Sequence, residues 1–379
     1  RMTLSTQQDS FWDEIVKQTQ AKNTTSDKQP FFSLAPMEAV TDTIFRRVVA
    51  QAGPPDVYYT EFTNASSMVH PKAKFSVQGR LAVAENEAQP VAQIWGSRPE
   101  DIAGAAKILP TMGYRAVDIN MGCPDATVIK NGAGSDLIRH DNLAEKIISA
   151  AKTSGLPVSV KTRLGFYHAE EFRDWLPIIL RQNVAVLTVH LRSRKEMSKV
   201  PAHVEYIDEI LAMRDKLAPK TLIQINGDIK TRAEGLALAK IHPGIDGIMI
   251  GRGIFENPYA FEKIPRQHTL EESIALLKRQ LDLFDDVNAN VTPKHFEALK
   301  RYFKIYLRGF AHASSLRQLL METHSTTEVR QILTRELARV YEAVASDQHI
   351  YRDNAAAIAD MAMATAEKHQ SAADHKNNS

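Results

Sequence analysis

A single cysteine, Cys123, lies in the stretch Asn120-Met-Gly-Cys-Pro124, directly after an apolar, strand-like run. The neighbouring glycine and proline favour a loop, and functional side chains concentrate in loops. An unperturbed thiol has a pKa of about 8.5, so this thiol is mostly protonated at neutral pH and could donate a proton as a general acid. The alternative is a buried structural thiol, which is what most free cysteines are.

Two cations, Lys161 and Arg163, stand two residues apart in the run PVSVKTR at 157–163. Alternate residues of a strand face the same side, and burying two cations there is costly unless an anionic or electron-rich group meets them. One interpretation is a Schiff-base lysine whose pKa Arg163 helps to lower. That interpretation leaves Cys123 without a role, whereas a lysine that stabilises negative charge on a reduced flavin explains more of the pattern.

Glycine-rich turns end two further runs, at Gly227 in TLIQINGD and at Gly251 and Gly253 in IMIGRGIFENP. In barrels of alternating strands and helices, the loops after strands seven and eight commonly hold a phosphate group with backbone N–H groups. With Arg252 added, the pattern favours a phosphorylated cofactor or substrate.

The elements that position these residues are eight short apolar runs with helical patterns between most of them. The runs span residues 31–37, 56–62, 91–96, 116–120, 157–163, 185–190, 221–226 and 246–253, and helical patterns occur at 99–113 and 142–155. Such alternation over roughly 230 residues predicts an α/β protein, a (β/α)8 TIM barrel. A doubly wound sheet is the alternative, but no G-x-G-x-x-G follows the first run, and NGAGSD at 131–136 matches only partly and in the wrong place.

Most of the runs are apolar inside and polar where they end. The polar residues at or just after these ends are Glu38, Glu61, Asn120, Lys161, Arg163, His190, Asn226, Asp228 and Arg252, and Gln93 lies within the third run. Because barrel enzymes assemble their chemistry at the carboxyl ends of the strands, we expect these side chains to converge there.

The pattern changes to capped helices from about residue 264. We expect an N-terminal extension at 1–30, a catalytic barrel at 31–263, an all-helical domain at 264–345, and a helical and then frayed tail at 346–379. The helix-start signals are the capping boxes Thr269 to Glu272 and Ser325 to Glu328, and Thr292 before Pro293.

The stretch 294–308, KHFEALKRYFKIYLR, predicts one helix with an apolar and a basic stripe. The basic stripe is Lys294, Arg301, Lys304 and Arg308. Five Lys or Arg against one Glu give this stretch a local formal charge of +4, while the whole chain carries only +2. The stripe is either a solvated helix face or a surface that follows nucleic-acid phosphates.

Composition excludes several classes of protein. One cysteine in 379 residues excludes an intramolecular disulfide, a cysteine-ligated iron–sulfur cluster and an all-thiolate zinc site. No run reaches the ~20 apolar residues of a membrane span, and the first 20 residues lack the apolar region of a signal peptide. We therefore expect a cytoplasmic protein that uses neither a membrane nor a metal.

Taken together, these stretches resemble the dihydrouridine synthases, flavin enzymes that reduce uridine in transfer RNA. The similarity spans about residues 31–320 and follows the family's order. Its motifs are APMEAVTD (35–42), VAQIWG (91–96), DINMGCP (118–124), SVKTRLG (159–165), VHLRSR (189–194), INGDI (225–229), MIGRG (249–253), KRYFKIYLRGF (300–310) and SSLRQLL (314–320). The chain departs from the family at Leu191, where glycine is frequent, and at Ile225, where glycine or alanine is usual.

The resemblance implies a barrel that binds FMN and is reduced by NADPH, with hydride passing to C6 of uracil and Cys123 protonating C5. The implied cofactor residues are Pro36, Met37, Glu38, Gln93, Lys161, His190, Asn226, Gly227, Asp228, Gly251 and Arg252. Asn120 is implied at the target uracil. We further expect Arg163, Lys294, Arg301, Lys304 and Arg308 to contact the tRNA.

Two other functions stay open on sequence alone. One is a flavin barrel that acts on a free small molecule, similar to a dihydroorotate dehydrogenase, which would share the FMN residues but not need the basic C-terminal stretch. The other is a non-catalytic RNA-binding protein, which would bind no flavin.

Overall fold

The computed structural model describes residues 10–23, 27–73 and 77–346. The chain divides into two compact units. The first comprises residues 1–46, 55–229 and 238–251, and the second comprises residues 47–54, 230–237 and 252–379. Apart from its first residue, the tail predicted at 346–379 lies outside the described residues.

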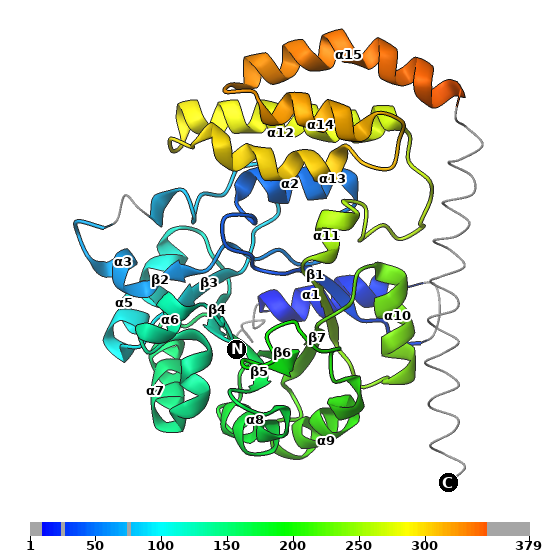
Figure 1. Ribbon diagram of the computed structural model, residues 1–379. Coiled ribbons are helices and arrows are strands. Elements are labelled where there is room, and N and C mark those ends of the chain that lie inside the picture. The colour runs from blue at the N-terminus through cyan, green and yellow to red at the C-terminus, as the bar shows by residue number, and fades with distance from the viewer. Residues whose placement is uncertain (1–9, 24–26, 74–76, 347–379) are drawn as a thin grey trace, which may run out of the picture. The chain divides into compact units, whose positions relative to one another are not determined.

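The first unit is built on eight parallel strands that close into a barrel (Figure 1). They are β1 (Phe31–Leu34), β2 (Thr63–Asn64), β3 (Ala92–Trp95), β4 (Val117–Met121), β5 (Val158–Gly165), β6 (Val186–Ser193), β7 (Leu222–Asn226) and β8 (Gly247–Ile250). The sheet order β1-β8-β7-β6-β5-β4-β3-β2 is completed by parallel bridges from Ser33 to Val57 and from Tyr59 to Val91. The predicted barrel is therefore confirmed, and a doubly wound sheet is wrong.

The second predicted run differs from the others. Residues 56–62 pair with their neighbours through isolated bridges, and the regular strand β2 begins only after them. Backbone bonds from Leu34 N to Val57 O and from Val91 N to Tyr58 O still join this segment to both neighbours. The barrel is closed here by single contacts.

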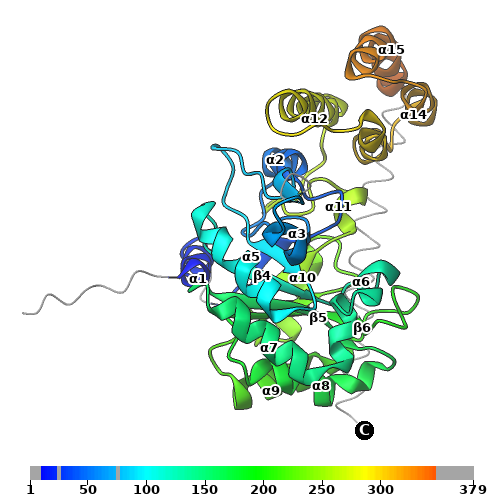
Figure 2. The same cartoon turned by 90° about the vertical axis from the view of Figure 1, so that its left-hand side faces the viewer.

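Helices connect the strands on the outside of the barrel (Figures 1 and 2). The helices wholly within the first unit are α1 (Phe11–Ala21), α3 (Ala65–Val69), α5 (Pro99–Thr111), α6 (Ala126–Lys130), α7 (Asp141–Lys152), α8 (Phe172–Leu180) and α9 (Ile207–Leu217). Short 3₁₀ helices occur at Gly134–Arg139, Ala169–Glu171 and Val204–Tyr206. The helices predicted at 99–113 and 142–155 are confirmed as α5 and α7.

The barrel interior is filled by hydrogen-bonded side chains. The Gln224 carboxamide oxygen accepts a bond from Ser33 Oγ at 2.5 Å, and its nitrogen donates to Tyr59 OH at 3.1 Å and Thr188 Oγ1 at 2.8 Å. All four side chains are buried. This layer makes the barrel a packed core rather than a pore.

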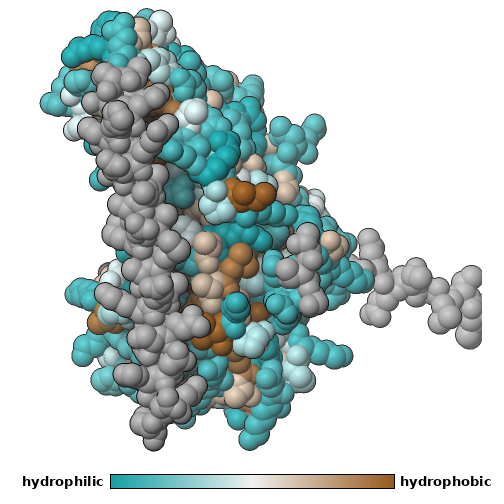
Figure 3. Space-filling model, turned by 90° about the vertical axis from the view of Figure 1, so that its right-hand side faces the viewer, coloured by the Kyte–Doolittle hydropathy of each residue, from teal (hydrophilic) through white to brown (hydrophobic). Residues whose placement is uncertain are grey.

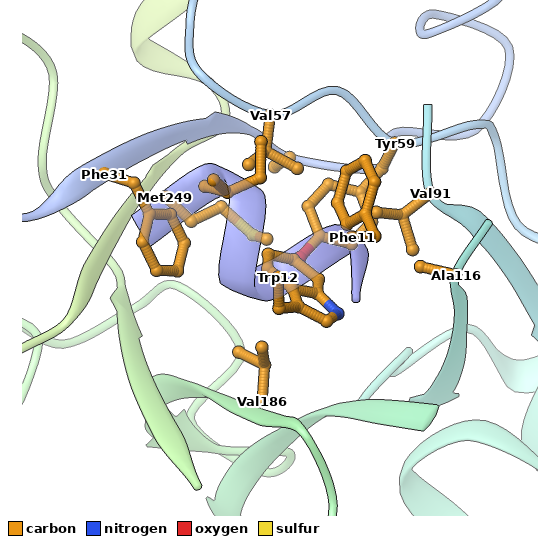
Figure 4. Close-up of a cluster of buried hydrophobic side chains, with 11 residues drawn as sticks. Phe11, Trp12, Phe31, Val57, Tyr59, Val91, Ala116, Val186 and Met249 are labelled. Carbon is orange, nitrogen blue, oxygen red and sulfur yellow. The ribbon is translucent and has the colours of Figure 1, made fainter. Parts of the chain in front are cut away.

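The N-terminal helix α1 fills the amino-terminal end of the barrel (Figure 4). Phe11 and Trp12 are buried among residues at or before the starts of strands. Those residues include Phe31, Val57, Tyr59, Val91, Ala116 and Val186. The sequence predicted an extension here, and the structure shows that it forms a helix whose apolar face is part of the barrel core.

The second unit is helical. Its elements after residue 252 are α11 (Gly253–Glu256), α12 (Leu270–Asn290), a 3₁₀ helix (Phe296–Tyr302), α13 (Phe303–Tyr306), α14 (Ala313–Met321) and α15 (Thr326–Ser346). α2 (Thr43–Ala52) and α10 (Arg232–Ile241) contain residues of both units. The predicted C-terminal helical region is confirmed, and so is the capping box at the start of α12. At the start of α15 the Glu328 N–H donates to Ser325 Oγ, while the Glu328 carboxylate accepts from His324 N.

The predicted helix at 294–308 is wrong as one element. A 3₁₀ segment occupies 296–302 and a single α-turn follows, because Leu307 leaves the helical conformation and Gly309 has a φ of +72°. The start predicted at Thr292 is also wrong, since the Thr292 N–H bonds back to Val287 O at the end of α12.

No helix within the described ranges combines the length and the apolarity that crossing a bilayer requires. Hydrophilic residues predominate on the face drawn in Figure 3, with a smaller group of apolar residues among them.

Candidate active site

Strand register brings the predicted barrel residues to one edge of the sheet. Asn120 of β4 pairs with Lys161 of β5, and Arg163 of β5 pairs with His190 of β6. His190 in turn pairs with Asn226 of β7. These are the carboxyl ends of adjacent parallel strands, so the side chains stand side by side around the mouth of the barrel.

The loop that carries Cys123 is held by hydrogen bonds to both the N–H and the carbonyl group of Cys123. The Asn120 side-chain oxygen accepts the N–H of Gly122 at 3.1 Å and of Cys123 at 2.9 Å. The Cys123 carbonyl accepts bonds from Ser135 N at 3.0 Å and Ser135 Oγ at 2.8 Å. Gly134, at φ +61°, allows this approach, because a Cβ there would lie 2.9 Å from that carbonyl oxygen. The thiol is therefore displayed on a fixed loop.

A buried carboxylate sets the orientation of the side chains beneath this loop. Asp118 accepts bonds from Gln93 Nε2 at 2.7 Å and Ser159 Oγ at 2.6 Å. The Gln93 oxygen then accepts from Asn120 Nδ2 at 3.2 Å, which leaves the Asn120 oxygen for the Cys123 loop. An ionised carboxylate only accepts hydrogen bonds, so the side-chain amides of Gln93 and Asn120 each have one possible orientation.

Arg163 also forms a hydrogen bond to the loop that carries Cys123. Its Nε donates to Gly122 O at 2.9 Å, and its Nη1 donates to Met197 O at 2.9 Å and Ser193 O at 3.3 Å. The guanidinium thus joins the loops after β4 and β6. The contact with tRNA expected for Arg163 stays a prediction, and these three bonds give the residue a structural role as well.

The Cys123 thiol is half-buried. Burial raises the pKa of this thiol, and a backbone hydrogen bond at Asp125 only partly opposes the rise. At neutral pH the thiol therefore keeps its proton, which is the state that a general acid needs.

The Lys161 ammonium makes no hydrogen bond or ion pair with any residue that the structure describes. Burial and then the nearby charge of Arg163 lower the pKa of Lys161 to about 8. Burial raises the pKa of Asp118, a buried carboxylate whose charge acts on Lys161, to about 6. An unpaired ammonium at the mouth of the barrel is suited to an anionic or electron-rich ligand.

His190 and the turn after β7 are linked through Arg192. The Arg192 guanidinium lies 3.1 Å from His190 Nε2 and donates to Asp228 Oδ1 at 2.5 Å. The turn itself needs Gly227, whose φ is +123°, and Asp228 follows at φ +56°. Asn226 donates to Met249 O at 3.2 Å.

The residues after β1 and β8 complete the mouth of the barrel. Pro36 is buried, and Met37 and Glu38 are progressively more exposed. Glu38 forms an ion pair with Arg80, whose Nη1 also lies 3.8 Å from Glu61. A Cβ at Gly251 would lie 3.9 Å from the Met37 sulfur, so the ends of β1 and β8 are adjacent.

Five predicted residues lie in the second unit, and they differ in exposure. Arg252 begins α11 as its N-cap residue. Arg301 and Lys304 are exposed, and Lys294 is partly exposed. Arg308 donates to Glu256 O at 3.0 Å and to Phe255 O at 3.4 Å, so it closes the carboxyl end of α11.

The residues of the first unit fit a flavin nucleotide. Lys161 offers a charge for the electron-rich part of the ring, and the turn at Gly227 presents backbone next to His190. Asp118, Ser135 and Arg192 were not predicted as site residues. Asp118 and Arg192 stand two residues from Asn120 and His190, so the strand alternation that placed those residues also indicated these.

Comparison with known proteins gives consistent matches over most of the chain. Residues 33–348 match the model of the family described as dihydrouridine synthase (Dus). A protein from Staphylococcus epidermidis named probable tRNA-dihydrouridine synthase is 52% identical over 312 residues, which cover 82% of this chain and 95% of that protein. A protein from Bacillus subtilis named probable tRNA-dihydrouridine synthase 2 is 51% identical over 325 residues, covering 86% and 96%. A solved old yellow enzyme homologue from Zymomonas mobilis has 15% identity and a TM-score of 0.43, covering 66% of this chain and 93% of that one, and assigns no function.

Proposed function

Because this chain belongs to the dihydrouridine synthase family, we propose that it reduces a uridine of transfer RNA to 5,6-dihydrouridine, with FMN as its bound cofactor and NADPH as the reductant. The observation that supports this proposal is the protonation and the position of the Cys123 thiol. The thiol keeps its proton, and its loop is held by hydrogen bonds. It also stands at the same strand ends as the Lys161 ammonium, which has no hydrogen-bond or ion-pair partner among the described residues.

Cys123 acts as the general acid. Reduction of the C5=C6 bond of uracil requires a hydride at one carbon and a proton at the other. FMN, when bound and reduced by NADPH, would supply the hydride to C6. The Cys123 Sγ–H bond breaks as the proton moves to C5, and the resulting thiolate then regains a proton from solvent. The raised pKa of this thiol keeps the proton available at neutral pH.

The residues at the ends of the strands would hold the flavin. Lys161, His190 and Gln93 would bind its ring, and the Lys161 charge would stabilise negative charge there. Pro36, Met37 and Glu38 would also contact the ring. Asn226, Gly227, Asp228, Gly251 and Arg252 would bind the ribityl chain and phosphate.

The target uracil is positioned by Asn120. Its carboxamide nitrogen uses one hydrogen for Gln93, so a second N–H is available for a carbonyl oxygen of the base. The uridine must leave the base stack to reach this position, and an unpaired loop nucleotide leaves the stack at the lowest cost.

The second unit holds the RNA backbone. Arg301 and Lys304 are exposed cations in a stretch with a local charge of +4, which suits phosphate contacts. Lys294 and Arg308 extend this set, with Arg308 also closing α11. Such contacts explain why a barrel with its own cofactor site carries a helical unit.

One assay separates this function from the other flavin reactions. The purified protein, supplied with FMN and NADPH, is incubated with unmodified tRNA, with orotate or with free uracil. We expect dihydrouridine in the tRNA and no turnover of the two free pyrimidines. Reduction of orotate with unmodified tRNA left unchanged would contradict the proposal, as would a purified protein that binds no flavin. Mapping dihydrouridine in tRNA from a strain that lacks the protein then identifies the uridine that it reduces.

A further inference from the structure

The buried side chain of Arg192 connects three parts of the site. Arg192 is 2% exposed. Its Nε donates to Val200 O at 2.7 Å in the loop after β6, and its Nη2 donates to Asp228 Oδ1 at 2.5 Å in the turn after β7. Its Nη1 lies 3.1 Å from His190 Nε2 on the same strand. Each nitrogen of the guanidinium therefore has a different partner, and the orientation of the group is fixed.

This geometry decides where the proton of His190 lies. A guanidinium donates hydrogen bonds, accepts none and stays charged at all ordinary pH values. The ring nitrogen 3.1 Å from Arg192 Nη1 must therefore accept, so Nε2 carries no proton. An imidazole with a bare Nε2 is neutral and carries its single hydrogen at Nδ1.

The surroundings of Arg192 make this arrangement stable. Asp228 balances the guanidinium charge, and the Asp228 carboxylate is itself held by the Ala202 N–H at 2.8 Å. A hydrogen on His190 Nε2 would instead point at the N–H groups of Arg192, and a guanidinium cannot accept it.

We propose that Arg192 is a positioning residue that holds His190 as a neutral imidazole in the Nδ1–H tautomer. In this state His190 carries a neutral N–H at Nδ1, a type of donor that suits the carbonyl oxygens of a flavin ring. The use of that donor toward FMN rests on the proposed function, whereas the tautomer itself does not.

Nitrogen-15 NMR of the histidine side chains tests the proposal directly. The protein is labelled with [¹⁵N]histidine and studied at pH 7, with and without FMN, and the His190 signals are assigned by their loss in His190→Gln. Long-range ¹H–¹⁵N spectra distinguish the two neutral tautomers from the imidazolium. We expect the Nδ1–H tautomer in the unmodified protein. An Nε2–H tautomer or an imidazolium in both states would overturn the proposal, whether or not the protein modifies tRNA.

Variants then identify Arg192 as the cause. Arg192→Met removes the donor, so His190 should change to the Nε2–H tautomer that imidazole prefers in water. Arg192→Lys keeps a cationic donor and should keep the Nδ1–H tautomer. Arg173→Met removes an exposed arginine that pairs with Glu209 and should change nothing. An unchanged tautomer in a folded Arg192→Met protein would show that another group fixes the ring. If Arg192→Met does not fold, the spectra of the unmodified protein and of Arg192→Lys still show whether His190 has the proposed tautomer.

Discussion

The Asn120 side-chain oxygen accepts the backbone N–H of Cys123 at 2.9 Å. The residue that the resemblance places at the uracil therefore also positions the thiol that we propose as the proton donor. Because Gln93 and Asp118 orient Asn120 from below, the position of the thiol is set by groups in the barrel interior. A fixed loop suits proton transfer, which requires the donor within hydrogen-bond reach of the accepting carbon.

The first prediction concerns the hydrogen bonds by which Asn120 holds the Cys123 loop. Asn120→Ala removes the acceptor for two backbone N–H groups, at a cost of about 2 kcal/mol in the free energy of unfolding. The loosened loop should expose the thiol, so Cys123 should react several-fold faster with an alkylating reagent. Asn131→Ala, at an exposed asparagine on the same segment, is the matched control and should leave the rate unchanged. Equal alkylation rates in both variants would show that Asn120 does not hold the loop.

The second prediction concerns the charge of Lys161. Its pKa of about 8 means that the flavin-free protein loses this positive charge as the pH rises through 8, whereas exposed lysines keep theirs to about 10.4. Arg163→Met removes one cause of the shift and should raise the pKa of Lys161. An NMR titration of the ¹³C-methylated protein measures both values, with the Lys161 signal assigned by Lys161→Met. A Lys161 that titrates with the surface lysines would contradict the burial of its ammonium.

The third prediction is a pH dependence of stability. Burial alone would lower the pKa of His203, but hydrogen bonds to Glu196 at 2.6 Å and Glu205 at 2.8 Å raise it above the ordinary value. Protonated His203 ties these carboxylates together in the segment after β6. Because the folded-state pKa is raised, this stabilisation is fully present below the unfolded-state pKa of about 6.5 and is lost as the pH rises through the folded value.

Melting temperatures of the unmodified protein and of His203→Gln measure this effect. The variant should melt at a lower temperature than the unmodified protein at pH 6, and the gap should close by pH 9. His242→Gln, which changes a histidine paired with the exposed Asp208, serves as a comparison elsewhere on the barrel. A gap between the unmodified protein and His203→Gln that is the same at both pH values would rule out the protonated bridge.

The fourth prediction concerns tRNA binding. Arg301→Ala with Lys304→Ala should weaken binding and reduce the slope of log K against log salt by about one unit for each lost phosphate contact. Arg335→Ala with Arg339→Ala removes the same charge from exposed positions on α15 and is the matched control. If both double variants have the slope of the unmodified protein, the stretch 294–308 does not contact the RNA backbone.

Strand patterning predicted the barrel and the edge at which its polar residues meet. Apolar runs with polar ends can be recognised in the sequence, and parallel strands bring those ends to the same edge of the sheet. The hydrogen-bond partners of each side chain were not visible in the sequence. Strand alternation indicated Asp118 and Arg192, but the bond from Gln93 to Asp118 and the contact of Arg192 with His190 became evident only in the structure.

Two differences between the predictions and the structure arise from tertiary contacts. The stretch 294–308 has helical periodicity, but a 3₁₀ segment and the turn at Gly309 interrupt it, and Arg308 is used to close α11. The burial of Phe11 and Trp12 was not predicted either, because a short amphipathic helix does not reveal which surface it covers. In both cases tertiary contacts override the local signal.

The measurement that tests the account most directly is a single turnover of Cys123→Ala. The variant is loaded with FMN, reduced with NADPH and mixed with unmodified tRNA, and flavin reduction and dihydrouridine formation are followed separately. With the general acid removed, we predict an unchanged rate of flavin reduction and a fall of about 10²- to 10⁴-fold in dihydrouridine formation. Dihydrouridine formed at the rate of the unmodified protein would show that the proton does not come from Cys123.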